Sequence, residues 1–219
     1  MNYYVGIDPS MNSTGICIQK FDENNEKINE NFVILKPVGI ENKNKRHLTK
    51  KEQAAEEAIF NFQYWFYDKH ETNKEDPNTI HEYCKSLNMT NCANEIKNIV
   101  KEYTKDNPEN IYIVIEGISY GSTIRTKSIF DLAGLNYLVR EKFINTNENI
   151  RLIIPTPSEI KKFASGNGNC KKEIMINLFK ISHNDFDIVP KVDDISDAWF
   201  MSNYALHMIL NNVLEGYQI

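Results

Sequence analysis

The stretch of residues 3–18 constrains the fold more than any other part of this chain. Val5 and Ile7 alternate with smaller or polar neighbours, which is the pattern of a strand. Pro9 lacks an amide donor and ends that strand, and a turn rich in Ser and Asn leads into a second extended run. The sequence therefore predicts a β-hairpin that fixes Asp8 at a strand end open to solvent, which suits a metal ligand.

The remaining chain alternates strand and helix patterns, and their order predicts an α/β protein. Strands are expected at 31–35, 111–116 and 151–154; the last two are apolar runs typical of strands covered on both faces. Helices are expected at 49–68, 127–143, 157–163, 171–181 and 193–210. Three hairpin-linked strands followed by two crossover strands predict a single domain over 1–219. Its mixed five-stranded sheet has three antiparallel and then two parallel strands, flanked by helices.

Two segments need a further interpretation. The capping box at 49–52 opens the first helix, and Phe62, Trp65 and Phe66 then recur at helical spacing, which favours core packing over a platform for stacking bases. Residues 69–108 are charged and irregular at first. They predict short helices at 80–87 and 91–103 and are expected to form a helical insertion in the domain.

Length and composition narrow the class of protein. A chain of 219 residues with 41% apolar residues can bury one sizeable core. No apolar run approaches the length of a membrane span, and the N-terminus enters a strand at once, so neither a membrane anchor nor a signal peptide is expected. The expected location is the cytoplasm, or that of the host cell if the protein is phage or viral.

The cysteines favour reduced, unpaired thiols. No pair has the Cys-x-x-Cys spacing of a zinc or redox motif among the four, which are Cys17, Cys84, Cys92 and Cys170. Zinc binding is a less favoured alternative, because the candidate ligands are irregularly spaced; they are His70, His81, Cys84 and Cys92.

The net charge of −5 requires that any DNA-binding surface be local. Segment 41–51 holds five basic residues against one acidic residue, and it fits either a solvated loop or a phosphate-contacting loop. Segment 151–180 holds six basic residues against two acidic ones. Basic residues therefore cluster in two places that the overall charge conceals.

Four carboxylates are candidates for one metal centre. Asp8 and Glu116 each end a predicted strand, whereas Asp194 and Asp197 lie three residues apart and share one face of the last helix. Each acid also has an ordinary explanation as a turn former or helix cap. If the strands are neighbours and the helix crosses their ends, the four acids repel one another unless cations bind. Oxygen ligands favour Mg²⁺ or Mn²⁺, and two such ions could clamp a phosphodiester.

Four motifs resemble those of the RuvC family of Holliday-junction resolvases, and they occur in the family's order. The first is Gly6-Ile7-Asp8-Pro9-Ser10 with Thr14-Gly15, and the second is Ile115-Glu116-Gly117. The third combines Ile160-Lys161-Lys162 with the stretch from Gly166 to Lys172, and the fourth is Asp194-Ile195-Ser196-Asp197-Ala198. The resemblance covers both ends of the chain and leaves 69–108 unaccounted for.

The resemblance implies a ribonuclease-H-like fold, a homodimer and metal-dependent cleavage of branched DNA, above all four-way junctions, leaving 5′-phosphate and 3′-hydroxyl ends. It implies that Asp8, Glu116, Asp194 and Asp197 bind two Mg²⁺ ions, which Mn²⁺ can replace, and that Lys172 is catalytic. Residues expected to contact DNA are Lys161, Lys162, Lys171, Lys172, Tyr120, Arg125 and Lys127. Ser119 falls near the position of an aromatic wedge in the family, with Tyr120 beside it, and Tyr120 fits base stacking or an ordinary loop tyrosine equally well.

Three alternatives stay open at the level of sequence. A nuclease on the same fold could cut forks or flaps as well as four-way junctions. An actin-like ATPase or sugar kinase also uses an Asp-containing hairpin, but no second phosphate-binding hairpin is present in this sequence. A DNA-binding protein without catalysis is disfavoured because all four acids are present.

Overall fold

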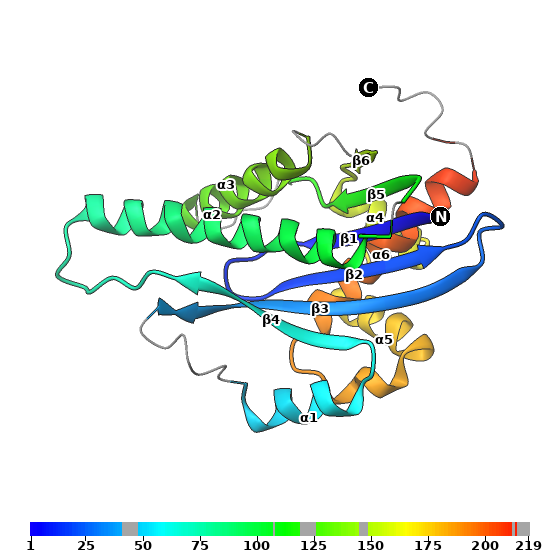
Figure 1. The fold of residues 1–219 in the computed structure, drawn as a ribbon, viewed down its shortest axis with the longest axis horizontal. Helices are drawn as coiled ribbons and strands as arrows, with labels where there is room; N and C mark the ends of the chain where they lie inside the picture. The colour runs from blue at the N-terminus through cyan, green and yellow to red at the C-terminus, as the bar shows by residue number, and fades with distance from the viewer. Residues whose placement is uncertain (41–47, 107, 119–125, 145–148, 212, 214–219) are drawn as a thin grey trace.

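The computed structural model describes residues 1–40, 48–106, 108–118, 126–144, 149–211 and 213, apart from the side chains of 126–128. Figure 1 shows a central sheet with helices on both sides. The strands are β1 (Asn2–Asp8), β2 (Thr14–Phe21), β3 (Lys27–Gly39), β4 (Phe62–Lys69), β5 (Asn110–Ile115) and β6 (Ile150–Ile153). The helices are α1 (Lys50–Ala58), α2 (Asn78–Tyr103), α3 (Thr126–Ile144), α4 (Pro157–Ser165), α5 (Lys172–Ser182), the 3-10 helix η2 (Asn184–Ile188) and α6 (Val192–Leu210).

The sheet has the strand order β4-β3-β2-β1-β5-β6. Strands β1, β2 and β3 pair antiparallel, while β5 runs parallel to β1 and β6 runs parallel to β5. The predicted mixed sheet is therefore confirmed, with β1 near its centre. The two strands that carry Asp8 and Glu116 are direct neighbours, as the crossover connection required.

Side chains alternate between the two faces of the sheet and build a separate core on each. On one face Tyr4, Cys17 and Phe32 pack with α1, α4, α5 and α6. On the other face Val5 and Ile7 pack with α2 and α3. Figure 1 shows the same division, with α2 and α3 on one side of the strands and α1 and α5 on the other. Strands covered on both faces explain the nearly continuous apolar runs of the sequence.

The helix predicted over 49–68 is wrong beyond Ala58. Thr49 forms the expected capping box with Glu52, but α1 ends at Ala58 and the aromatic run becomes β4, parallel to β3 at the sheet edge. The sheet therefore has six strands instead of five. Aromatic residues favour strands, and over so short a run their spacing fits either period. The prediction that Phe62 is a core residue is confirmed, because it is 1% exposed.

A single helix of 26 residues, α2, replaces the two short helices predicted within 69–108. Its second half supplies most of its buried residues, including Ile96 and Ile99, and these join the core that contains β1. Its first half is largely exposed, which explains why the helical pattern of the sequence weakens there. That 69–108 is an insertion stays a prediction.

None of the helices in the described part of the chain combines the length and apolarity that crossing a bilayer requires. All four cysteines are free thiols, and Cys17, Cys92 and Cys170 are buried. Buried thiols at these positions act as small apolar side chains.

Candidate active site

Asp8 and Glu116 leave adjacent parallel strands at the same level and on the same face. The last registered pair of β1 and β5 is Ile7 with Ile115, and both side chains point into the core beneath α2 and α3. Because side chains alternate along a strand, the next residue of each chain faces the opposite side, where α6 lies. The backbone at Glu116 is fixed by hydrogen bonds, since its carbonyl accepts from Asn136 Nδ2 at 3.0 Å and Gly117 N donates to the Pro155 carbonyl at 2.7 Å.

Helix α6 lies directly against the hairpin because two glycines leave room for its backbone. A Cβ atom on Gly6 would overlap the carbonyl oxygen of Ala198, and one on Gly15 would overlap that of Asp194. One turn further along α6, Ser202 Oγ donates to Cys17 Sγ at 3.3 Å. This contact brings the first two turns of α6, with Asp194 and Asp197, against the strand end that carries Asp8.

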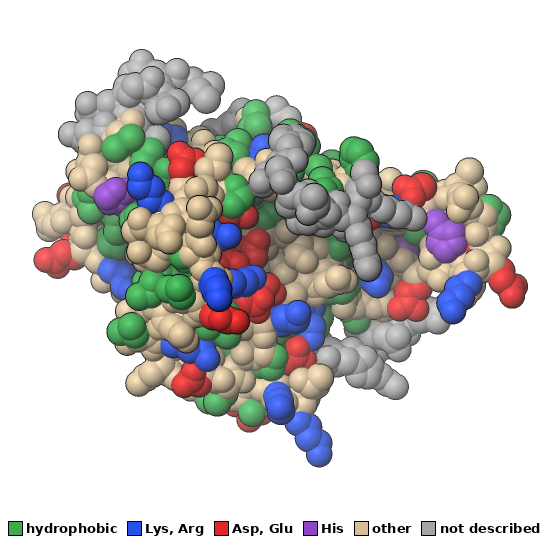
Figure 2. All heavy atoms as spheres, turned by 180° about the vertical axis from the view of Figure 1, so that it is seen from behind, with side chains coloured by type: hydrophobic (Ala, Val, Ile, Leu, Met, Phe, Trp, Pro, Cys, Tyr) green, Lys and Arg blue, Asp and Glu red, His purple; other side chains and the backbone are tan. Residues whose placement is uncertain are grey.

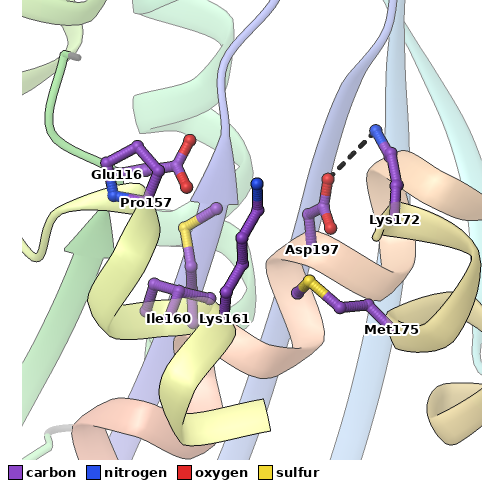
Figure 3. Close-up of a pocket in the computed structure, with 8 residues that line it drawn as sticks. Glu116, Pro157, Ile160, Lys161, Lys172, Met175 and Asp197 are labelled. Carbon is purple, nitrogen blue, oxygen red and sulfur yellow. Dashed lines mark ion pairs between the residues drawn. The ribbon is translucent and has the colours of Figure 1, made fainter. Parts of the chain in front are cut away.

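A pocket of about 200 Å³ opens between β5, α4, α5 and α6 (Figure 3). Its polar residues are Glu116, Asp197, Lys161 and Lys172, and its apolar lining comes from Pro157, Ile160, Met175 and Met201. In Figure 3, Lys161 extends from α4 toward the space between Glu116 and Asp197. The pocket therefore combines acids that could bind a cation with ammonium groups that could meet a phosphate.

The predicted basic residues divide into two groups. Lys172 Nζ lies 3.1 Å from Asp197 Oδ2 and 3.1 Å from Asp193 Oδ2, and Lys161 lowers the pKa of Glu116 by its charge. Lys162 and Lys171 are exposed and are not part of the pocket lining. Acidic and basic side chains lie together near the middle of the face seen in Figure 2, so the surface there is mixed in charge.

Burial and mutual repulsion raise the pKa values of the two strand-end acids. Burial is the largest cause for Asp8, followed by the charges of Asp197, Asp194 and Glu116, and its pKa lies well above the usual range. For Glu116, burial and then Asp197 raise the pKa to about 7, although Lys161 and Lys172 act against the shift. Without added positive charge, the site therefore favours the protonated form of both carboxyl groups more than an exposed position would.

The two acids of α6 share this behaviour. Burial raises the pKa of Asp194, which the Ser13 hydroxyl partly offsets, and burial raises that of Asp197 against the opposing charge of Lys172. Burial lowers the pKa of Lys172, but its ion pairs with Asp197 and Asp193 outweigh that and raise it overall. Four mutually repelling carboxyl groups and one tightly held ammonium group therefore face each other.

The residues fit a divalent cation by one direct test. Asp194 Oδ2 is buried and accepts no hydrogen bond among the described residues; the nearby Ser13 hydroxyl, which lowers the pKa of Asp194, is likewise buried and unpaired there. A buried carboxylate oxygen without a donor is costly, and a cation with oxygen ligands removes that cost. In the same described residues, no three His, Cys, Asp or Glu side chains already stand in the arrangement that would hold one metal ion.

Several other residues expected to contact DNA are not described by the structure. Tyr120 and Arg125 lie outside the described residues, as does most of the basic segment 41–51, and Lys127 lies in α3 with its side chain outside the described part. Zinc binding by His70, His81, Cys84 and Cys92 also lacks support, because the described residues contain no group of three such side chains that could hold a metal ion. His81 Nδ1 is instead 2.8 Å from Thr72 Oγ1, and Cys92 is buried in the core.

Asp193 and Ser13 are the residues near the site whose contacts sequence reasoning did not assign. Asp193 stands beside the fourth motif, but an acid there is equally typical of an ordinary helix N-terminus. Ser13 is 7% exposed and belongs to the hairpin turn, where serine is common for conformational reasons. Neither position carries a signal in sequence, because Asp193 meets Lys172 only where α6 packs against α5, and Ser13 approaches Asp194 only where α6 packs against the hairpin.

A mixed sheet with an antiparallel hairpin at its centre, parallel crossover strands and helices on both faces defines the ribonuclease-H-like class of fold. A scan against protein-family models finds no match, and a search of curated proteins finds no similar sequence. Among solved structures, that of Thermus thermophilus RuvC is similar with a TM-score of 0.55 at 10% identity, covering 96% of both chains. This likeness confirms the ribonuclease-H-like fold predicted from sequence.

Two further solved structures are similar at lower scores. Thermus thermophilus RuvC in complex with a Holliday junction substrate has a TM-score of 0.46 at 10% identity, covering 94% of this chain and 95% of the other. The yeast mitochondrial Holliday junction resolvase Ydc2 has a TM-score of 0.45 at 12% identity, covering 98% of this chain and 83% of the other.

Proposed function

We propose that this chain is a metal-dependent, structure-selective endonuclease that resolves four-way DNA junctions by hydrolysis, leaving 5′-phosphate and 3′-hydroxyl ends. The observation that carries the proposal is the position of Asp8 and Glu116 on adjacent parallel strands, facing the helix that holds Asp194 and Asp197. The four motifs that resemble the RuvC family supply the substrate class. The ribonuclease-H-like fold is compatible with both.

The four acids are the proposed ligands of two Mg²⁺ ions, which Mn²⁺ can replace. When bound, such ions activate water and stabilise charge on a phosphodiester. The acids contribute by holding these cations on rigid elements, namely two strand ends and the first turns of α6. Their raised pKa values support this role, because a cation stabilises the charged carboxylates against the burial and the mutual repulsion that raise these values.

The lysines of the pocket are proposed to act on the phosphate. Lys161 and Lys172 line the same pocket as Glu116 and Asp197, so their ammonium groups can offset charge that grows on the phosphate during cleavage. Lys162 and Lys171, which do not line the pocket, are proposed to bind DNA, as are Tyr120, Arg125 and Lys127. The protein is proposed to act as a homodimer, because two strands of a junction must be cut. Its proposed location is the cytoplasm.

One assay tests the proposal against its alternatives. The protein is incubated with Mg²⁺ and labelled four-way, fork, flap and linear duplex substrates, beside the Asp8→Asn and Glu116→Gln variants. We expect paired cuts in the four-way junction, lost in both variants while junction binding persists. Equal cutting of plain duplex contradicts junction resolution, and equal cutting of forks and flaps identifies the broader nuclease. ATP hydrolysis without any DNA cleavage favours the kinase-like alternative.

A further inference from the structure

Lys172 is held between two acids that have different surroundings. Asp193 and Asp197 are one helical turn apart on α6, so their carboxylates face the same side, and Lys172 Nζ is 3.1 Å from an oxygen of each. The side chain of Asp197 is 22% exposed and lines the pocket, whereas that of Asp193 is 33% exposed. The strongest repulsions on Asp8 come from Asp197, Asp194 and Glu116. Asp193 is more exposed than Asp197 and does not line the pocket, although its charge adds to burial in raising the pKa values of Asp194 and Asp197.

The lysine competes with any cation for Asp197. An ammonium group in direct contact with a carboxylate neutralises the charge that a divalent cation needs, and at this range the attraction is strong in a partly buried site. A cation that binds Asp197 therefore displaces Lys172 from one of its two partners. Lys172 must nevertheless stay near the pocket if it is to act on the phosphate.

We infer that Asp193 is a positioning residue that retains Lys172 beside the pocket when Asp197 binds a cation; the inference rests on the proposed function. Asp193 provides a second carboxylate at the same distance, so the lysine can give up Asp197 without leaving the site. The acid acts through Lys172 and makes no contact with substrate or cation. It lowers the competition between ammonium and cation and preserves the orientation of Lys172.

This role predicts a coupling between two substitutions. Without the Asp193 carboxylate, Lys172 has Asp197 as its remaining partner in this pair, and it competes fully with the cation. Asp193→Asn should therefore weaken cation binding when Lys172 is present. In a Lys172→Ala background there is no ammonium group to retain, and the same substitution should have little effect. A double-mutant cycle isolates this pairwise dependence from the general loss of one negative charge.

The experiment uses Mn²⁺ alone as the probe, with its dissociation constant measured by isothermal titration calorimetry and checked by paramagnetic resonance. Wild type, Asp193→Asn, Lys172→Ala and the double variant form the cycle. We expect Asp193→Asn to weaken Mn²⁺ binding by about fivefold in the wild-type background and by less than about twofold with Lys172→Ala. Asp193→Glu should restore most of the affinity. Glu173→Gln, which removes an exposed acid next to Lys172 in sequence, is the matched control for charge and should leave the affinity unchanged.

The outcomes separate this inference from the proposed function. Equal weakening in both backgrounds means that Asp193 acts on the cation directly, and it overturns the positioning role while leaving the metal site intact. No weakening in either background also overturns it. If wild type binds no Mn²⁺, the proposed metal site fails and this inference fails with it. Circular dichroism melting of each variant establishes that the comparison is made between folded proteins.

Discussion

Gly6 in the first strand and Ala198 in the last long helix approach each other so closely that a Cβ atom on Gly6 would overlap the Ala198 carbonyl oxygen. The neighbouring Ser202 amide nitrogen would also lie within 2.7 Å of that Cβ. Both obstacles are backbone atoms, so rotation of a side chain cannot relieve the overlap. The close packing of α6 on the hairpin therefore depends on the absence of a side chain at residue 6. The positions of Asp194 and Asp197 depend on it too, because both residues lie on α6.

Gly6→Ala should lower the free energy of unfolding by about 2 kcal/mol or more, because α6 must move away from the sheet. Urea denaturation measures the change. The matched control is Gly134→Ala in α3, where a Cβ would approach Met89 Sδ only to 3.4 Å and alanine is the better helix former. The control should be neutral or slightly stabilising. Equal stability of wild type and Gly6→Ala would contradict the close packing of α6 against the hairpin.

Asp8→Asn should abolish metal-dependent cleavage while making the metal-free protein more stable. The substitution removes a carboxyl group whose pKa is raised well above normal by burial and by its acidic neighbours, so the folded state loses a repulsion. We expect a fall in cleavage rate of at least about 100-fold and a higher melting temperature in EDTA. A lower melting temperature in EDTA would show that Asp8 is a stabilising residue instead of a strained one.

Cation binding should strengthen as pH rises through about 7, the pKa of Glu116. A carboxyl group with a raised pKa keeps its proton in the folded state after the unfolded chain has lost it. Between the ordinary value of 4.5 and about 7, the metal-free fold therefore loses stability as pH rises. A cation must displace that proton below pH 7.

Titrations with Mn²⁺ at several pH values, in buffers of different ionisation enthalpy, measure the proton released on binding. Glu116→Gln should weaken binding and remove this part of the proton release. An affinity in wild type that stays constant from pH 6 to pH 8 would contradict the coupling between Glu116 and the cation.

Glu30→Gln should destabilise the protein by about 3 kcal/mol, because it disrupts a buried charge with several donors. Glu30 accepts from Gln19 Nε2 at 2.7 Å and Trp199 Nε1 at 3.0 Å, and its other oxygen is 2.9 Å from His183 Nε2. It thus connects β3 to α6 and to the residue that ends α5. Thermal and urea unfolding measure the loss, and Glu26→Gln, an exposed acid in the β2–β3 turn, should cause almost none.

The same group gives a second, pH-dependent signature. Burial alone would raise the pKa of Glu30, but hydrogen bonds from His183 and Gln19 outweigh it and lower the pKa to about 2. Its stabilising contribution is complete above the ordinary value of 4.5 and is lost as pH falls from there toward 2. The stability difference between wild type and Glu30→Gln should therefore shrink over that range.

Lys161→Ala and Lys162→Ala should affect different steps although the residues are adjacent. Lys161 lines the pocket with Glu116, so its loss should slow cleavage of bound junctions by about 100-fold in single-turnover assays. Lys162 is exposed, so its loss should leave that rate unchanged and reduce the salt dependence of binding by about one phosphate contact. Identical effects of the two substitutions would contradict the division between pocket and surface lysines.

Strong local patterns made much of the fold predictable. The alternation of the hairpin, the continuous apolar run of β5 and the helical repeat of α6 each form one clear pattern, and their order allows few topologies. The aromatic run from Phe62 did not show one, because its spacing fits a helix as well as a strand. The decisive contact for β4 is its pairing with β3, which no local pattern contains.

Sequence placed the four acids on strand ends and on one helix, and the structure brings them together through the packing of α6. The partners of Lys172 and of Glu30 were beyond sequence reasoning. The Glu30–His183 contact spans 153 positions, and the Lys172–Asp193 contact depends on how two helix ends meet. Such contacts follow from tertiary packing, and single-sequence patterns report only on neighbours along the chain.

The packing of α6 on the hairpin also determines when, during synthesis, the proposed metal site can form. The Ser202–Cys17 contact spans 185 positions, so the hairpin leaves the ribosome long before the helix that covers it. A chain that ends before α6 carries Asp8 and Glu116 but lacks Asp194 and Asp197. In such a chain no helix covers the hairpin at Gly6 and Gly15. Incomplete chains therefore lack half of the proposed metal ligands, and we expect metal-dependent activity only from chains whose α6 has packed onto the hairpin.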